Sequence, residues 1–80
     1  MRRHPRAAHA LRADDMRRHP HMWIEVAVYN GPSSAESTAR EIRTGDRIHH
    51  YRPAGAFETH TTPVPDGGTA LYARYIGGPL

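Results

Sequence analysis

Residues 33–58 read SSAESTAREIRTGDRIHHYRPAGAFE, and the pattern of this segment sets the expected architecture. Small or aliphatic residues recur in it with helical spacing: Ala35, Ala39 and Ile42. Such a narrow apolar face favours a helix that lies close to a sheet. Ser33 stands three residues before Glu36, as in a capping box, and Gly45 is placed to end the helix in the left-handed conformation. The segment therefore predicts a helix over residues 34–44.

Strands are expected on both sides of this helix. Apolar and polar residues alternate over residues 23–29, which predicts a first strand with Ile24, Val26 and Val28 facing the helix. Three more segments read as strands bounded by proline and glycine turns: 47–52, 56–62 and 69–76. The order βαβββ indicates a small α+β module, with one helix packed on one face of a mainly antiparallel sheet. We assign residues 22–80 to this single domain.

Residues 1–21 differ from the rest of the chain in charge and composition. They hold six arginines and two aspartates, a net charge of +4, whereas residues 22–80 hold five arginines and six acidic residues, a net charge of −1. Their few apolar residues bury little surface, so we expect a disordered tail rich in arginine and histidine. Met22 stands directly before the first strand, which suggests that the tail lies upstream of the native start. The sequence contains no run of apolar residues long enough to cross a membrane.

One helix covers only one face of a sheet, so the other face is expected to be open. The residues that we place on that face, as a partner-binding surface, are aromatic or basic: Trp23, Tyr29, Tyr72 and Arg74. In the other possible register of the last strand, Leu71 and Tyr75 would take the places of Tyr72 and Arg74. Aromatic residues and arginine are enriched at the centres of protein interfaces. The first hypothesis is therefore a protein that binds a host protein or its own copy. A homodimer is in keeping with a chain of 80 residues, which has little core of its own.

The alternative hypothesis is nucleic-acid binding through the same face. Aromatic rings beside arginine stack bases and neutralise phosphates. The arginine tail would help, as would a phosphate-contacting group on and after the helix: Arg40, Arg43 and Arg47. The net charge of −1 outside the tail favours protein over nucleic acid, because phosphate contacts supply much of the affinity for nucleic acid.

The residues that carry chemistry in enzymes do not form a convincing set in this sequence. His49 and His50 are adjacent, so in a strand they would point to opposite faces and could not share a metal ion. The serines lie in the region expected to begin the helix, outside any nucleophile motif. We therefore predict no catalytic residues, no metal site and no cofactor, and we interpret the protein as a non-enzyme.

Three segments carry a resemblance to a group of proteins: TAREIRTG at 38–45, YRPAGAFE at 51–58 and LYARYIGG at 71–78. In these segments the chain resembles small uncharacterised proteins of actinobacteriophages and their high-GC hosts. The resemblance spans residues 22–78 and assigns no site residue. It implies a cytoplasmic accessory protein, encoded by a phage or prophage, that binds a host component.

Overall fold

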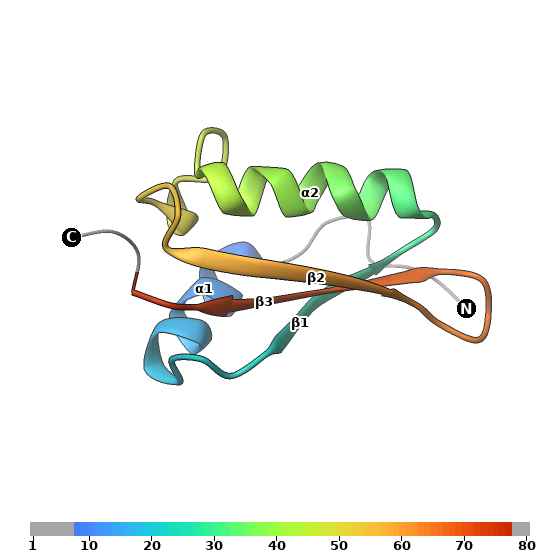
Figure 1. Ribbon diagram of the computed structural model, residues 1–80, viewed down its shortest axis with the longest axis horizontal. Helices are drawn as coiled ribbons and strands as arrows, with labels where there is room; N and C mark the ends of the chain where they lie inside the picture. The colour runs from blue at the N-terminus through green and yellow to red at the C-terminus, as the bar shows by residue number, and fades with distance from the viewer. Residues whose placement is uncertain (1–7, 78–80) are drawn as a thin grey trace.

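A computed structural model describes residues 8–77 of the chain. These residues form an α+β fold, which confirms the predicted fold class. Along the chain the elements are α1 (His9–Arg18), β1 (Ile24–Tyr29), α2 (Pro32–Thr44), the short 3₁₀ helix η1 (His49–Tyr51), β2 (Phe57–Pro63) and β3 (Thr69–Tyr75). Figure 1 shows α2 lying along one side of the sheet. No helix within residues 8–77 has the length and apolar character needed to cross a membrane.

The sheet has three strands in the order β1-β3-β2, and both pairings are antiparallel. β3 is therefore the central strand, and β1 and β2 are the two edges. The register of β1 on β3 shifts between Glu25 and Ala27, so that Val26 forms a bulge. A bulge changes which face the following side chains occupy. The side chains before and after Val26 therefore do not share one alternation between the two faces of the sheet.

α2 forms where the sequence predicts it and buries the predicted face. Ala35, Ala39 and Ile42 are all almost completely inaccessible to solvent. Gly45 ends the helix with φ of 67°, and its N–H donates to the carbonyl of Glu41. The small side chains on this face let the helix lie close to β2 and β3.

The predicted capping box is wrong. The N-cap residue of α2 is Gly31, and no side chain caps this end of the helix. Pro32 occupies the first turn, where its fixed φ suits the helix and its lack of an N–H has no cost. The helix therefore starts before Ser33, and Glu36 pairs with Arg43 instead of reaching back to the cap.

The predicted strand over residues 47–52 is also wrong. This segment contains the 3₁₀ helix η1, which places the ring of Tyr51 fully inside the core. The Arg52 side chain donates to the carbonyl oxygens of Gly45 and Asp46, just beyond the end of α2. The segment folds back on the helix because these carbonyl oxygens gain donors and Tyr51 gains apolar contacts.

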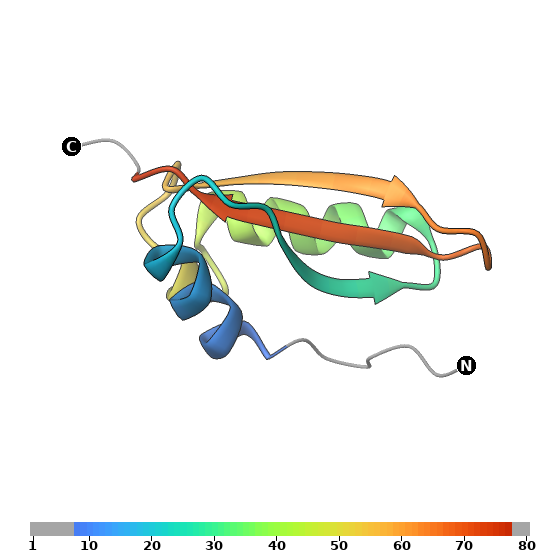
Figure 2. The ribbon, with the colours of Figure 1, turned by 90° about the horizontal axis from the view of Figure 1, so that it is seen from below.

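The predicted disordered tail is contradicted over His9–Arg18, where the chain forms α1; residues 1–7 lie outside the described part of the chain. Ala13 and Met16 of α1 are almost completely buried and belong to the same core cluster as Ile42, Phe57 and Leu71. Figure 2 shows α1 to one side of the sheet, at the end where β3 finishes. The helix is therefore part of the folded body, and the domain boundary at residue 22 divides one core.

Candidate surface for a binding partner

The face of the sheet turned away from α2 is the candidate functional site. In Figure 2 this face points toward the viewer, and α2 lies behind the strands. The register places Glu25, Tyr72 and His60 in one row across the three strands. We name this side of the sheet the Trp23 face, after its largest side chain; it also carries Glu25, Glu58, His60, Thr62, Tyr72 and Arg74.

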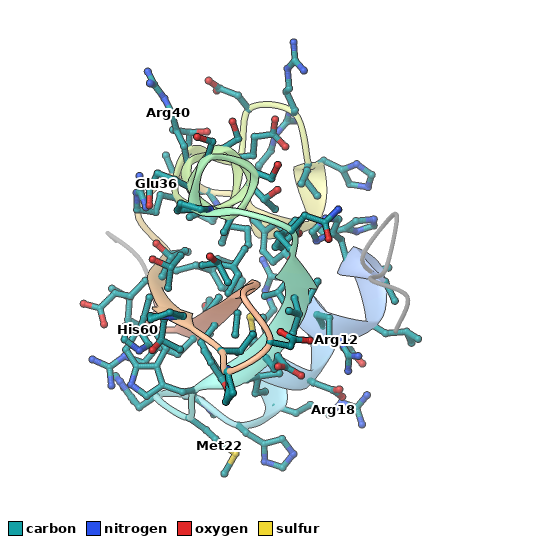
Figure 3. All side chains as sticks on the ribbon, turned by 90° about the vertical axis from the view of Figure 1, so that its right-hand side faces the viewer. Arg12, Arg18, Met22, Glu36, Arg40 and His60 are labelled. Carbon is teal, nitrogen blue, oxygen red and sulfur yellow. The ribbon has the colours of Figure 1, made fainter. Side chains whose placement is uncertain are left out.

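Three aromatic rings lie near one another on the Trp23 face. The ring centroids of Trp23 and His60 are 5.7 Å apart, and those of His60 and Tyr72 are 6.0 Å apart. Trp23 remains 41% exposed and is one of three large apolar side chains left exposed within residues 8–77, with Leu11 and Met22. Together with Thr62, the rings line a shallow hollow of about 440 Å³. In Figure 3, His60 lies on the side of the sheet away from α2.

Arg74 lies beside the Trp23 ring, and its charge is already compensated. Its Nε atom is 2.7 Å from Oε1 of Glu58, and its Nη2 atom is 2.6 Å from the same oxygen. The Cζ atom of Arg74 lies 4.5 Å from the centroid of the Trp23 ring, a cation–π contact. The ion pair and the ring contact therefore link Glu58 of β2 and Arg74 of β3 to Trp23, which directly precedes β1.

Two carboxylates and one guanidinium lie on this side of the sheet within residues 8–77. Glu25 is exposed in the row of Tyr72, and Glu58 binds Arg74. The two carboxylates and the guanidinium together therefore carry one excess negative charge. A surface of this kind repels phosphate groups more than it attracts them.

Tyr29 was predicted to share this face, and that prediction is wrong. Tyr29 pairs with Thr69, on the side of the sheet that carries Leu71, and it packs against the core. The reason is the bulge at Val26, because Trp23 precedes the bulge and Tyr29 follows it. For the same reason Val28, which was expected to face the helix, pairs with Ala70 on the open side. Trp23, Tyr72 and Arg74 do come together there.

The three arginines proposed for phosphate contact do not act as one free cluster. Arg43 donates to the hydroxyl of Thr59 and forms an ion pair with Glu36 at 3.0 Å. Arg40 and Arg47 are exposed, and acidic residues line the same shallow hollows of about 400 and 240 Å³ beside α2: Glu36 in the first, Glu41 and Asp46 in the second. Figure 3 shows Glu36 and Arg40 close together on α2. The surface of α2 is therefore mixed in charge.

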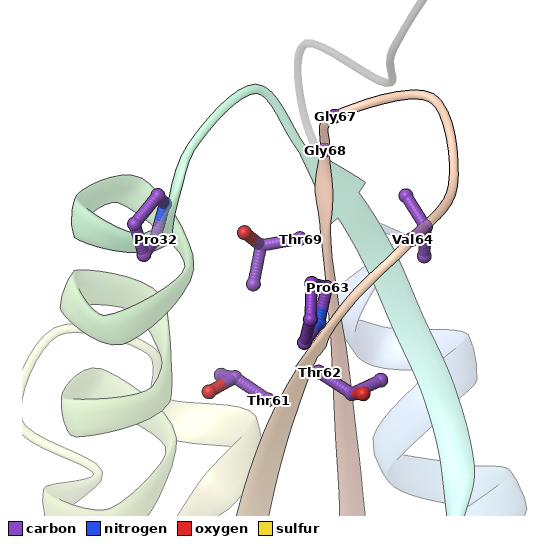
Figure 4. Close-up of a pocket in the computed structure, with 8 residues that line it drawn as sticks. All are labelled: Pro32, Thr61, Thr62, Pro63, Val64, Gly67, Gly68 and Thr69. Carbon is purple, nitrogen blue, oxygen red and sulfur yellow. The ribbon is translucent and has the colours of Figure 1, made fainter.

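A further hollow of about 360 Å³ lies between the start of α2 and the β2–β3 hairpin (Figure 4). Its lining consists of small apolar or hydroxyl-bearing residues and glycines: Pro32, Thr61, Thr62, Pro63, Val64, Gly67, Gly68 and Thr69. None of these side chains is ionisable at neutral pH, so the hollow offers neither a general acid nor a general base.

A polar cluster between α1 and η1 was missed by the sequence reasoning. Nδ1 of His9 lies 2.7 Å from the hydroxyl of Tyr51. Arg17 donates to the carbonyl oxygens of His50 and Arg52, and its guanidinium lies 5.1 Å from the centroid of Phe57. The sequence did contain a signal for the helix α1, because His9, Ala13 and Met16 repeat the spacing of the buried residues in α2. These contacts explain why a helix with few apolar residues stays docked.

Burial shifts the pKa values of Tyr51 and His9 in opposite directions. Burial raises the pKa of the Tyr51 hydroxyl well above its ordinary value, and Tyr29 adds to the effect. Burial lowers the pKa of His9 below its ordinary value of 6.5, although the carboxylate of Glu41 partly opposes the shift. Both groups are therefore held neutral at pH 7.

The lowered pKa of His9 predicts a loss of stability on acidification. Below pH 6.5 the unfolded chain binds a proton at this residue before the folded chain does, so the free energy of unfolding falls as the pH drops through that range. The free energy of unfolding, measured with urea, should decrease less between pH 7.5 and pH 5 for His9→Gln than for the unchanged protein. His19→Gln, at an exposed site, serves as the control. An equal pH dependence of His9→Gln and the unchanged protein would refute the prediction.

The histidine and carboxylate side chains of the described part of the chain do not gather into a metal-binding group. Within residues 8–77, no three histidine, aspartate or glutamate side chains lie close enough together to hold a metal ion. His49 and His50 were expected to point to opposite sides of a strand; instead they lie in η1 with ring centroids 4.1 Å apart. The 3₁₀ conformation brings the two rings together because neighbouring side chains no longer alternate.

No protein-family model, curated protein or solved structure matches this chain. The resemblance to actinobacteriophage proteins therefore stays a prediction. The Trp23 face itself is the feature from which a function can be inferred.

Proposed function

We propose that this protein binds another protein through the Trp23 face and performs no catalysis of its own. The observation that supports this most is the exposed row of Trp23, His60 and Tyr72 beside an arginine whose charge is compensated. Tryptophan, tyrosine and arginine supply most of the binding energy at protein interfaces when a partner excludes water from them. Within residues 8–77, no helix packs over this row.

The charges on the face favour a protein partner over nucleic acid. A phosphate would have to compete with Glu58 for Arg74 and would also approach the carboxylate of Glu25. Phosphate contacts supply a large share of nucleic-acid affinity, so the loss of Arg74 as a phosphate contact would lower that affinity considerably. The nucleic-acid alternative would depend on Arg40 and Arg47, which have acidic neighbours.

The same features describe the segment of the partner that would fit. The hollow between the rings accepts an apolar or aromatic side chain, and the exposed carboxylate of Glu25 attracts a nearby lysine or arginine. The partner is then a host protein in the cytoplasm, and this chain is an accessory protein of a phage or prophage. That assignment of source follows from the three resembling segments.

Affinity capture from a lysate of a high-GC bacterium tests this proposal. The full chain, Trp23→Ala and Leu11→Ala are used as baits, because Leu11 is also a large exposed apolar residue but lies on α1. We expect one protein to be recovered by the full chain and by Leu11→Ala, with or without nuclease and at low or high salt. Trp23→Ala should recover at least about tenfold less, the factor given by roughly 1.4 kcal/mol.

Two results would count against the proposal. The first is equal recovery by Trp23→Ala and the full chain, which would place the contact elsewhere. The second is recovery that disappears with nuclease or falls steeply with salt, which would favour the nucleic-acid alternative.

A further inference from the structure

The free edge of β2 is the second unpartnered surface of the fold. β2 pairs only with β3, and the backbone groups of Ala56 with Ile76 and of Val64 with Gly68 mark the hydrogen-bonded positions of that pairing. Hydrogen-bonded and non-bonded positions alternate along an antiparallel pair. The N–H and C=O groups of Phe57, Thr59 and Thr61 therefore point away from β3. Within residues 8–77 β2 pairs with no strand other than β3, so these groups have no strand as a partner.

The two edges of the sheet differ in how they are protected. β1 carries the bulge at Val26 and has α1 packed beside it, and both features hinder the addition of another strand. β2 runs for seven residues without a bulge or a lysine, and its one proline is the last residue, Pro63. Threonine, which suits strands, occupies three of its positions. β2 is thus the edge available for pairing.

We propose that two copies of this chain pair antiparallel through their β2 edges, with Thr59 opposite Thr59 of the second copy. This register uses all three free N–H groups, and it sets Phe57 opposite Thr61 of the second copy. It also sets Glu58 opposite His60 of the second copy, twice, because of the two-fold symmetry. The result is a continuous six-stranded sheet with both Trp23 faces on the same side.

Charge selects this register over its neighbours. Centring the pair on Glu58 would place the two Glu58 carboxylates opposite each other, which is unfavourable. Centring it on His60 would place the two imidazoles opposite each other and leave Glu58 opposite Thr62. Only the Thr59-centred register brings acidic and basic side chains together. Arg43 lies near the symmetry axis through its bond to Thr59, and Glu36 compensates its charge.

Sedimentation equilibrium of the full chain tests the pairing. The unchanged protein should have twice the 9.0 kDa mass of one chain at micromolar concentration. Thr59→Pro removes a free N–H at the centre of the edge and leaves the pairing with β3 intact, so it should be a monomer with an unchanged circular dichroism spectrum. An unchanged protein that is monomeric at about 100 μM, or a folded Thr59→Pro that remains a dimer, would overturn the proposal.

Substitutions at His60 test the register by the sign of the charge and do not depend on how proline is tolerated. His60→Glu should weaken the dimer at least about tenfold, and His60→Lys should strengthen it, because each faces Glu58 of the second copy. Weakening by both substitutions would indicate the His60-centred register and reject ours. The edge proposal does not depend on the proposed function. Trp23→Ala should remain a dimer, and Thr59→Pro should still capture the partner protein.

Discussion

A chain that begins at Met22 is expected to lose its cooperative unfolding transition. It lacks Met16, which is completely buried, and removal of such a side chain alone costs roughly 2–5 kcal/mol. It also lacks Arg17, which covers the rings of Phe57 and Tyr75 and binds two carbonyl oxygens of the segment 50–52. Small domains have a total stability of about 5–15 kcal/mol, so these losses together approach the whole.

Urea unfolding followed by circular dichroism measures this effect. The matched control is a chain that begins at Ala8, which keeps α1 together with its contacts to η1 and the sheet. We expect the control to unfold with the same midpoint and slope as the full chain. If the chain from Met22 unfolds cooperatively within about 1 kcal/mol of the full chain, α1 is an accessory and its docking contributes little.

Tyr51→Ala is expected to destabilise the folded chain strongly. The ring of Tyr51 is fully buried, and it meets the rings of Phe57 and His9 edge-on, at centroid distances of 5.1 and 5.3 Å. Truncating a buried aromatic residue to alanine costs about 3–5 kcal/mol, because the cavity closes only in part. The loss should also loosen α1, since Tyr51 is its hydrogen-bond partner.

Tyr51→Phe is the matched control for this substitution. It keeps the ring and removes only the hydroxyl that lies 2.7 Å from Nδ1 of His9. The expected cost is about 1 kcal/mol, the contribution of one hydrogen bond. Thermal or urea unfolding of both variants compares the two effects. Equal costs for alanine and phenylalanine would mean that the hydroxyl, and not the packing of the ring, holds η1 in place.

Local patterns were sufficient to predict the helix α2 and the hairpin of β2 and β3. The buried positions Ala35, Ala39 and Ile42 follow from spacing alone, and Gly45 ends the helix as its residue type suggests. The strand expected over residues 23–29 is present as Ile24–Tyr29. In each of these the sequence preference and the tertiary contacts agree, which is why the prediction succeeds.

The features that were missed depend on contacts between distant parts of the chain. The bulge at Val26 arises in the pairing with β3, so nothing within residues 23–29 places Tyr29 on the helix side. η1 replaces the expected strand because Tyr51 is buried against Phe57 and His9. α1 has a weak apolar face of its own, and it is held by Met16 and by the long side chain of Arg17.

The candidate site was predictable only in part, because its make-up also depends on pairing between distant strands. Alternation placed Trp23 on the open face but left either Tyr72 with Arg74 or Leu71 with Tyr75 beside it, and the observed register selects Tyr72 and Arg74. Alternation alone does not decide the face of His60, because only the observed register of β2 on β3 places it opposite Tyr72. The ion pair of Arg74 with Glu58, which weakens the nucleic-acid alternative, also depends on that register.

Site-specific photo-crosslinking tests the central claim, a protein partner on the Trp23 face, most directly. A benzophenone-bearing residue replaces Thr62, which lines the hollow between the rings, or Leu11, which is exposed on α1. The full-length variants are irradiated in a nuclease-treated lysate of a high-GC bacterium. Our account predicts one adduct with a protein other than this chain from position 62 and none from position 11. No adduct at position 62, or the same adduct from both positions, would contradict it.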